Sequence, residues 1–282
     1  KKLENIAINN IDNCLRLLKH NKAYDITFFR LSSRIVPLAT HEELHDWDYI
    51  SAISEALQNL GDYARKNKMR IDFHPDHFVV LNSPKKEIVR TSVENLRYHY
   101  LLLKAMGITA KHRSVLHVGG SYADKDLALE RFIDNWGRIS PRIQEMIMLE
   151  NDDKTFNVED VLYLCEKLNI PHVFDLHHHL ANHNQEKWIN YWGRTVETWS
   201  KSHLPVKMHI SSPKDEKQFR NHADFIDPNM FLSFCKETNG STEQIDCMIE
   251  AKQKDEALFQ LVENLKKEST IKWLNNSTFM IE

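Results

Sequence analysis

The sequence predicts an α/β protein with a TIM (β/α)8-type barrel that lacks its first strand in this fragment. Two observations predict this fold. Short apolar segments alternate with longer segments whose apolar residues recur every three or four positions, as parallel strands alternate with their connecting helices. From the second onward, the apolar segments also end in a histidine or a carboxylate, which is typical of a barrel that carries a site at one end.

The seven expected strands are short and mostly apolar, which suits parallel strands covered on both faces. In chain order they are residues 24–31, 69–74, 114–118, 146–150, 171–176, 205–210 and 245–251. Pro75 ends the second strand, since proline has no N–H to donate to a neighbour. Pro171 and Pro205 open the fifth and sixth strands, a position that proline tolerates.

The expected helices share the three-and-four spacing of an amphipathic surface. In chain order they are residues 2–20, 47–67, 84–106, 124–138, a helix that begins after Asn157, then residues 185–200, 228–237 and 256–267. Asn157, with Asp160 three residues on, resembles a capping box. Because helix 2–20 precedes the first expected strand, an eighth strand is expected before Lys1. Residues 1–282 are then a single, N-terminally truncated catalytic domain.

An open, doubly wound sheet is the alternative fold, but it would usually bring a glycine-rich turn. The chain has only 7 glycines, and its adjacent pair, Gly119 and Gly120, does not fit GxGxxG. No nucleotide cofactor is therefore expected. No apolar run approaches the roughly 20 residues that cross a bilayer, so no membrane association is expected. The 4 cysteines show no CxxC spacing, which predicts free thiols in a reducing cytoplasm.

Charge argues mildly against a non-specific DNA binder, because the net charge is −3. That argument weakens if the protein carries divalent ions, which would be the largest local charges. The 16 histidines are the unusual feature of the composition, and they cluster. Six expected strands carry a histidine or a carboxylate at or near their last residue, and His178 lies just beyond one of these strands. The seven residues are His74, His117, Glu150, Asp175, His178, His209 and Glu250.

These seven side chains predict a metal site with more than one ion. Imidazole and carboxylate groups without cysteine suit Mn²⁺, Zn²⁺ or Fe²⁺. Glu150 and Glu250 could each bridge two ions, since a carboxylate has two oxygens. Two metal ions held close together in this way are typical of enzymes that hydrolyse phosphate esters. Without cations, carboxylates packed together would repel one another and their pKa values would rise.

The chain resembles the UV damage endonuclease family between about Phe29 and Lys254. The resemblance rests on these strings, in this order: FHPDHFVVLNSP, LRYHYLLLKAMG, VLHVGGSY, LENDD with NVEDVL, VFDLHHHLAN, KMHISSP and IEAKQK. It implies a TIM barrel whose metal cluster is related to that of endonuclease IV. It also implies an enzyme that cuts double-stranded DNA immediately 5′ of UV photoproducts and other lesions, with divalent metals.

Position by position, the resemblance implies the metal ligands His74, His117, Glu150, Asp175, His178, His209, His222 and Glu250. His222 is the one ligand that the strand ends do not supply. The cluster would hold two to three ions, with Mn²⁺ expected first and Zn²⁺, Mg²⁺ or Co²⁺ as alternatives. Catalysis is expected to depend on Glu150, Glu250, Lys207 and His209, where Lys207 matches a family lysine beside the cluster.

The expected DNA and lesion contacts are His41, His77, Phe78, Lys214, Lys217 and Arg220. His77 and Phe78 depart from the family, which often has Gln-Tyr after His-Pro-Gly; here Asp76 replaces the glycine. The family pair is thought to probe the bases opposite the lesion, and His77 and Phe78 keep planar groups at both places. The protein is expected to be monomeric.

Two other functions fit part of the pattern. A metal-dependent sugar isomerase or epimerase on a xylose-isomerase-like barrel also uses carboxylates and histidines, and a closed small-molecule pocket would favour it. A damage-binding module without catalysis would need basic residues more than a pair such as Glu150 and Glu250.

Overall fold

The computed structural model describes residues 1–44 and 46–282 and divides into two compact units, residues 1–148 and residues 149–282. The boundary falls inside strand β4, so each unit is described by itself. In the part of the chain that the structure describes, every helix is too short or too polar to cross a membrane.

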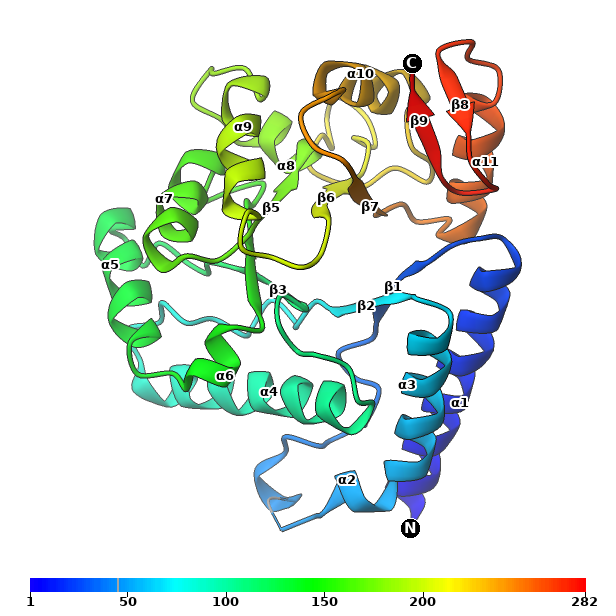
Figure 1. Cartoon of the computed structure of the whole chain (residues 1–282). Helices are drawn as coiled ribbons and strands as arrows, with labels where there is room; N and C mark the ends of the chain where they lie inside the picture. Colours follow the sequence, from blue (N-terminus) through cyan, green and yellow to red (C-terminus); the bar gives the residue numbers. More distant parts are fainter. Residues whose placement is uncertain (45) are drawn as a thin grey trace. The chain divides into compact units, whose positions relative to one another are not determined.

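Unit 1 alternates strands and helices in the predicted order (Figure 1). Its elements are α1 (Lys2–Ala23), β1 (Phe28–Leu31), η1 (Glu42–Leu44), α2 (Tyr49–Ala52), α3 (Ser54–Lys66), β2 (Arg70–Phe73), α4 (Lys86–Ala105), β3 (Ser114–His117), α5 (Lys125–Trp136), α6 (Pro141–Gln144) and the start of β4 (Ile147–Glu150). β1 pairs in parallel with β2 from Phe28 to Leu31, and β2 pairs in parallel with β3 at Phe73. Met146 accepts a hydrogen bond from Ser114 N, which sets β4 beside β3.

Unit 2 continues the same alternation from the end of β4. Its elements are α7 (Val158–Leu168), β5 (His172–Asp175), α8 (Leu176–Ala181), α9 (Ile189–Thr198), β6 (Val206–Ile210), α10 (Pro228–Thr238), β7 (Ile245–Ile249), α11 (Asp255–Leu265), β8 (Ile271–Trp273) and β9 (Phe279–Ile281). β4 through β7 pair in parallel in chain order. The predicted alternation and the parallel pairing are therefore confirmed. The capping box of Asn157 and Asp160 is also present.

The structure differs from the prediction in several places. The helix expected over residues 47–67 is two helices, because the backbone of Ile53, with φ −113° and ψ 10°, departs from helical angles. The strand expected over residues 171–176 ends at Asp175, and a helix follows at once where a polar loop was expected. The antiparallel hairpin of β8 and β9 was not predicted. Three-residue strands with mixed burial carry too little periodicity to be recognised.

β5 is held by contacts of His172 and Phe174, which restrict the position of Asp175 at its end. His172 N donates to Thr198 Oγ1 at 2.9 Å, and Trp199 Nε1 donates to the His172 carbonyl at 2.8 Å. Phe174 stacks on Phe234 of α10, with ring centroids 6.3 Å apart. Strand β5 can therefore move little relative to the helices that cover it.

The buried His99 of α4 should make unit 1 sensitive to acid. Its Nδ1 bonds to the Asn95 carbonyl at 2.8 Å, and burial lowers its pKa to about 4. Because this folded-state pKa lies below the ordinary value of 6.5, the unfolded chain takes up the proton first as the pH falls. The stabilisation is thus complete above about pH 6.5 and is lost towards pH 4.

We expect the free energy of unfolding in urea to fall by about 2 kcal/mol between pH 7 and pH 5 on account of His99 alone. The His99→Gln variant should show a correspondingly flatter pH dependence over that range. The same pH dependence in both proteins would contradict this role for His99. An exposed histidine, His20 on α1, provides the control.

Candidate metal centre

Unit 2 brings four predicted ligands together at the ends of its strands. Glu150 ends β4, Asp175 ends β5, His209 lies in β6 and Glu250 follows β7. His209 Nδ1 is 2.9 Å from Glu150 Oε1 and 3.4 Å from Glu250 Oε1. One ligand atom each from Asp175, His209 and Glu250 lies within 4.8 Å of the others. This spacing allows the three residues to share an ion.

His178 joins these residues because Asp175 caps the helix that follows β5. Asp175 Oδ1 accepts a hydrogen bond from His178 N at 2.7 Å, so α8 begins immediately after the strand. His178 Nδ1 then lies 3.4 Å from Glu150 Oε1 and 3.7 Å from Asp175 Oδ2. Glu150, Asp175 and His178 form a second group whose ligand atoms lie within 4.8 Å of one another.

Asn151 orients this second group, and sequence reasoning missed it. Its side chain donates to the Asp175 carbonyl and accepts from Asp175 N, both at 2.9 Å. Its own carbonyl bonds to His178 Nδ1 at 2.9 Å. Because Nδ1 carries that proton, Nε2 is the nitrogen through which His178 can ligate an ion. The signal was present in the sequence, as an asparagine directly after Glu150 in LENDD.

Burial makes the charges of this group strongly interdependent. Burial raises the pKa of Asp175, and the nearby Glu150 and Glu250 raise it further, although His178 opposes them. Burial alone would lower the pKa of His178, but Asp175 and Glu150 more than offset it and raise that pKa to about 9. Burial lowers the pKa of His209 to about 4. His209 is thus neutral at pH 7, as a metal-ligating histidine must be, whereas a cation bound by the carboxylates would have to displace the proton of His178 before that residue could ligate.

The donor set fits a divalent metal ion. Asp175 Oδ2 is buried and has no hydrogen-bond partner in the described part of the chain, which is costly for a carboxylate oxygen. A cation would satisfy that oxygen and offset the repulsion between carboxylates. Carboxylate oxygens and imidazole nitrogens are ligands for Mn²⁺ and Zn²⁺. The residues present therefore support a metal cofactor.

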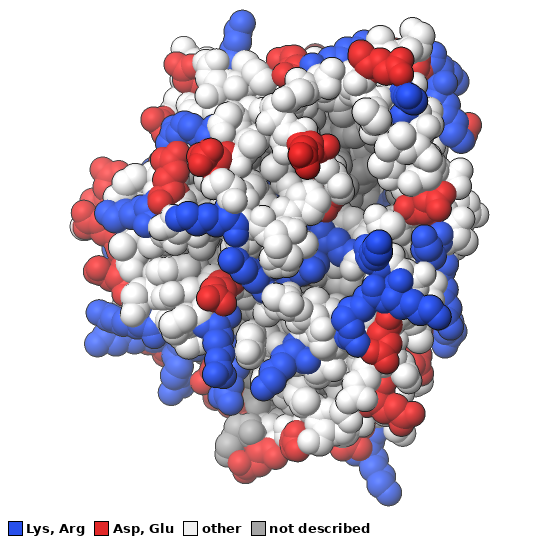
Figure 2. All heavy atoms as spheres, viewed as in Figure 1, with Lys and Arg blue, Asp and Glu red and all other residues white. Residues whose placement is uncertain are grey.

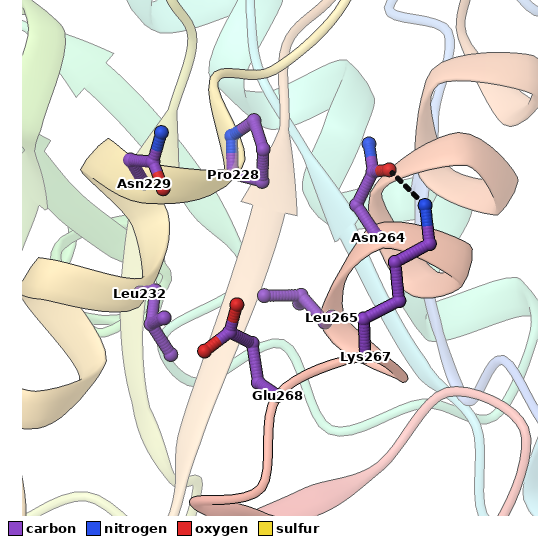
Figure 3. A pocket seen from close by; sticks show the side chains of 7 residues that line it. All are labelled: Pro228, Asn229, Leu232, Asn264, Leu265, Lys267 and Glu268. Carbon is purple, nitrogen blue, oxygen red and sulfur yellow. Dashed lines mark hydrogen bonds between the residues drawn. The ribbon is translucent and has the colours of Figure 1, made fainter.

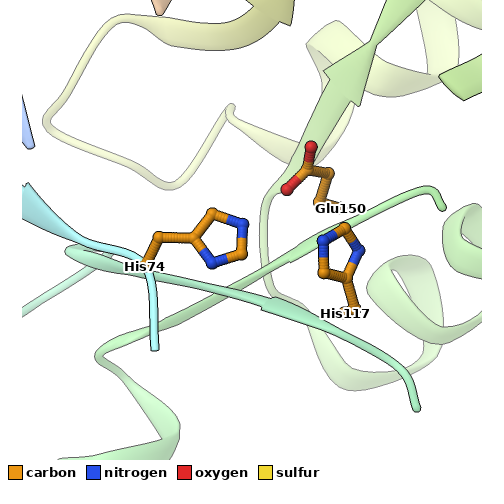
Figure 4. Close-up of side chains that lie close together, drawn as sticks. All are labelled: His74, His117 and Glu150. Atoms are coloured by element: carbon orange, nitrogen blue, oxygen red, sulfur yellow. The ribbon is translucent and has the colours of Figure 1, made fainter. Parts of the chain in front are cut away.

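Unit 1 brings together the two other predicted histidines that follow or end strands. His74 comes directly after β2 and His117 ends β3, and their ring centroids are 5.2 Å apart (Figure 4). Parallel pairing of β2 and β3 places both at the same end of the sheet. His74 Nδ1 bonds to the Pro75 carbonyl at 3.2 Å. Nε2 is then the His74 nitrogen that can face an ion.

The loop after His74 presents the predicted lesion-probing residues. His77 is exposed, and the side chain of Phe78 is 49% exposed. The loop is held by a turn in which Val79 N donates to the Asp76 carbonyl at 2.9 Å. Arg34, from the loop after β1, also bonds to Asp76 Oδ2 at 2.8 Å. Phe78 is therefore a half-exposed ring on an anchored loop.

The remaining predicted residues lie outside these groups. His41 is exposed in the loop after β1, and among the described contacts none ties it to His74. Lys207 is fully buried in β6, two residues before His209. His222 lies beside His178, with ring centroids 6.2 Å apart. The segment between β6 and α10, which contains His222, also contains the exposed basic residues Lys214, Lys217 and Arg220.

A cavity of about 230 Å³ lies between α10 and α11 and contains none of the predicted site residues (Figure 3). Its lining consists of Pro228, Asn229, Leu232, Asn264, Leu265, Lys267 and Glu268. Glu268 is the single carboxylate among them, and no histidine or cysteine accompanies it. This lining does not provide the ligands of a metal centre.

Comparisons with known proteins show which family this chain is similar to. The model of the family described as UV-endonuclease UvdE matches residues 1–280. A UV DNA damage endonuclease of Halalkalibacterium halodurans is 50% identical over 278 residues, which are 98% of this chain and 86% of that protein.

Two solved structures share the fold. SacUVDE has a TM-score of 0.86 and 33% identity, and the match covers 94% of this chain and 89% of that chain. Endonuclease IV from Thermus thermophilus has a TM-score of 0.61 and 13% identity, over 90% of this chain and 95% of that chain. The α/β TIM-type fold predicted from the sequence is therefore confirmed. On the family match and the identity to its relatives, this chain belongs to the UV-endonuclease UvdE family.

Proposed function

We propose that this protein is a metal-dependent DNA repair endonuclease that hydrolyses the phosphodiester 5′ to UV photoproducts and other lesions in double-stranded DNA. Family membership supports the activity. The observation that carries the metal dependence is the group of Glu150, Asp175 and Glu250 with His178 and His209. Glu150 and Asp175 are buried and the Glu250 side chain is 13% exposed, so cations would relieve the repulsion among the three carboxylates. We propose residues 1–282 as one catalytic domain that acts as a monomer.

The metal cofactor is proposed as a cluster of two to three divalent ions, with Mn²⁺ first and Zn²⁺, Mg²⁺ or Co²⁺ as alternatives. His74 and His117 would join Glu150 and Glu250 at one ion. Glu150, Asp175, His209 and Glu250 would hold a second, and His178 with His222 a third. When bound, such ions supply Lewis-acid stabilisation of phosphate oxygens and lower the pKa of water.

The chain's own residues then have distinct tasks. Glu150 and Glu250 position the ligands beside them. Glu150 accepts a hydrogen bond from His209, and burial keeps His209 neutral. Lys207 shares a strand face with His209, since side chains two apart in a strand point the same way. We propose that Lys207 acts beside the cluster.

DNA contacts are proposed to come from local groups. On the face shown in Figure 2, Lys and Arg side chains are interspersed with Asp and Glu, in keeping with the net charge of −3. Lys214, Lys217 and Arg220 would contact phosphates, which position the protein without reading sequence. His77, Phe78 and His41 would contact the lesion.

The four free thiols support a reducing cytoplasm as the site of action, and no nucleotide cofactor is expected.

A nicking assay tests this proposal directly. The protein, loaded with Mn²⁺, should nick UV-irradiated plasmid and leave unirradiated plasmid intact, and chelation with EDTA should abolish nicking. Activity should return when Mn²⁺ is added back in excess of the chelator. Unchanged nicking after verified metal removal would refute the metal dependence. Turnover of a sugar without nicking would favour the isomerase alternative, which the family assignment does not support.

A further inference from the structure

The segment from Pro213 to His222, here called the 213–222 loop, follows β6 and is ordered by its own hydrogen bonds. Pro213 and His222 form an antiparallel bridge, and Lys214 N donates to the Asn221 carbonyl at 2.8 Å. Asp215 Oδ1 accepts from Lys217 N at 2.9 Å and from Gln218 N at 2.8 Å. The loop therefore presents its outer residues from a defined backbone.

A buried histidine of α8 ties this loop to the helix that carries His178. The ring of His177 is fully buried, and its Nδ1 lies 2.6 Å from Ser211 Oγ. Its Nε2 lies 2.6 Å from the carbonyl of Phe219, at the outer part of the loop. A carbonyl can only accept, so Nε2 carries the proton and Nδ1 of the neutral ring accepts from the serine hydroxyl. Nε2 thus holds the loop at Phe219, and Nδ1 holds Ser211, two residues before the loop begins.

The ring of Phe219 is packed on one side and open on the other. It meets the His177 ring edge-on, with centroids 5.7 Å apart and an interplanar angle of 64°. The side chain is nevertheless 37% exposed, and the neighbouring Arg220 side chain is 55% exposed. An aromatic ring next to a cation on a rigid loop is the arrangement by which proteins stack on nucleic-acid bases.

Charge alone gives the loop little attraction for DNA. Its cations are Lys214, Lys217 and Arg220, and its carboxylates are Asp215 and Glu216, so three positive charges face two negative ones. Arg220 also lies 3.9 Å from Asp153. A net charge of about one unit gives the loop a weak overall attraction for DNA, so a contact to a base or a sugar would add to the phosphate contacts of its cations. Phe219 is the exposed aromatic side chain of the loop that could make such a contact.

We propose that Phe219 is a DNA-contacting residue and that His177 is the positioning residue that presents it. The proposal rests on the proposed function, because it names a contact to the same DNA substrate. His177 acts through the loop backbone and touches no substrate itself. Phe219 would stack on an exposed base or pack on a sugar beside the metal centre, next to the phosphate contact of Arg220.

Two variants of Phe219 test the contact. Phe219→Leu keeps apolar packing against His177 but removes the π face, and Phe219→Ala removes both. With metal-loaded protein and undamaged duplex, which is not cut, fluorescence anisotropy should show binding weakened by about 5- to 150-fold for Phe219→Ala. Phe219→Leu should weaken binding as well, and KM for the lesion duplex should rise while kcat stays within a factor of two. Tyr163→Leu, at another exposed aromatic, is the control.

Two variants of His177 test the positioning role. The amide nitrogen of His177→Gln can occupy the place of Nε2 and keep the bond to the Phe219 carbonyl, whereas the shorter His177→Asn reaches only Ser211. His177→Asn should therefore reproduce the rise in KM of Phe219→Leu, and His177→Gln should restore most of it. Metal content, measured by elemental analysis, should be unchanged in all four variants.

The outcomes separate this inference from the proposed function. If the wild type nicks damaged DNA and both Phe219 variants bind and cut as it does, the contact is refuted while the function stands. If His177→Asn loses metal, or if His177→Gln fails to rescue KM, the positioning role is refuted. A wild type that neither binds nor nicks irradiated DNA in the presence of Mn²⁺ refutes the proposed function itself.

Discussion

Replacing Glu150 by glutamine should reduce nicking of irradiated DNA by on the order of a thousand-fold or more. Glu150 is 1% exposed and its Oε1 accepts from His209 Nδ1 at 2.9 Å, with His178 Nδ1 3.4 Å away. Its carboxylate therefore orders two proposed metal ligands, in addition to its own proposed role as a ligand. Metal ions supply several kcal/mol of transition-state stabilisation, and about 4 kcal/mol corresponds to a thousand-fold in rate.

Glutamine is the informative replacement at this position because it keeps the shape of the side chain and removes the charge. Metal content should fall, while the affinity for DNA should change little, since phosphate contacts are proposed to lie elsewhere. Glu94→Gln, at an exposed position of α4, is the matched control and should leave nicking unchanged. Glu150→Gln protein that retains its metal and cuts at the wild-type rate would exclude the bridging role.

Replacing Phe78 by alanine should remove much of the preference for damaged duplex over undamaged duplex. Phe78 is 49% exposed on a loop that the Asp76 turn and Arg34 hold in place. As a wedge, the ring would pay an unstacking cost of a few kcal/mol, which is smallest where a photoproduct has already weakened pairing. Stacking on a base returns about 1–3 kcal/mol, so affinity for damaged duplex should fall by about 5- to 150-fold.

Paired binding measurements decide whether Phe78 reads the lesion. Affinity for undamaged duplex, metal content and melting temperature should stay close to the wild-type values. Leu17→Ala, at a position of α1 with a similar exposure of 47%, should change neither binding affinity nor selectivity. Equal loss of affinity for both duplexes, or a lowered melting temperature with unchanged selectivity, would show that Phe78 only packs.

Much of the fold and of the candidate site could be read from local patterns. Apolar runs closed by Pro75 or opened by Pro171 predicted the strands within a few residues, because burial on both faces of a parallel strand leaves a continuous apolar stretch. Strand-end residues such as Glu150 and Asp175 were predicted as site residues because parallel strands deliver their C-terminal ends to one edge. The capping box at Asn157 was legible because its partners lie three residues apart.

Other features depend on partners that are far apart in the chain. Asn151 holds Asp175, 24 residues away, and His177 holds Phe219, 42 residues away. No local period encodes such pairs, so the sequence could not distinguish a positioning asparagine or histidine from a solvated one. Likewise, only the folded loop shows that Phe78 is exposed whereas Phe73, five residues earlier, is fully buried. Sequence periodicity assigns side chains to a face, but burial is decided when distant segments cover that face or leave it open.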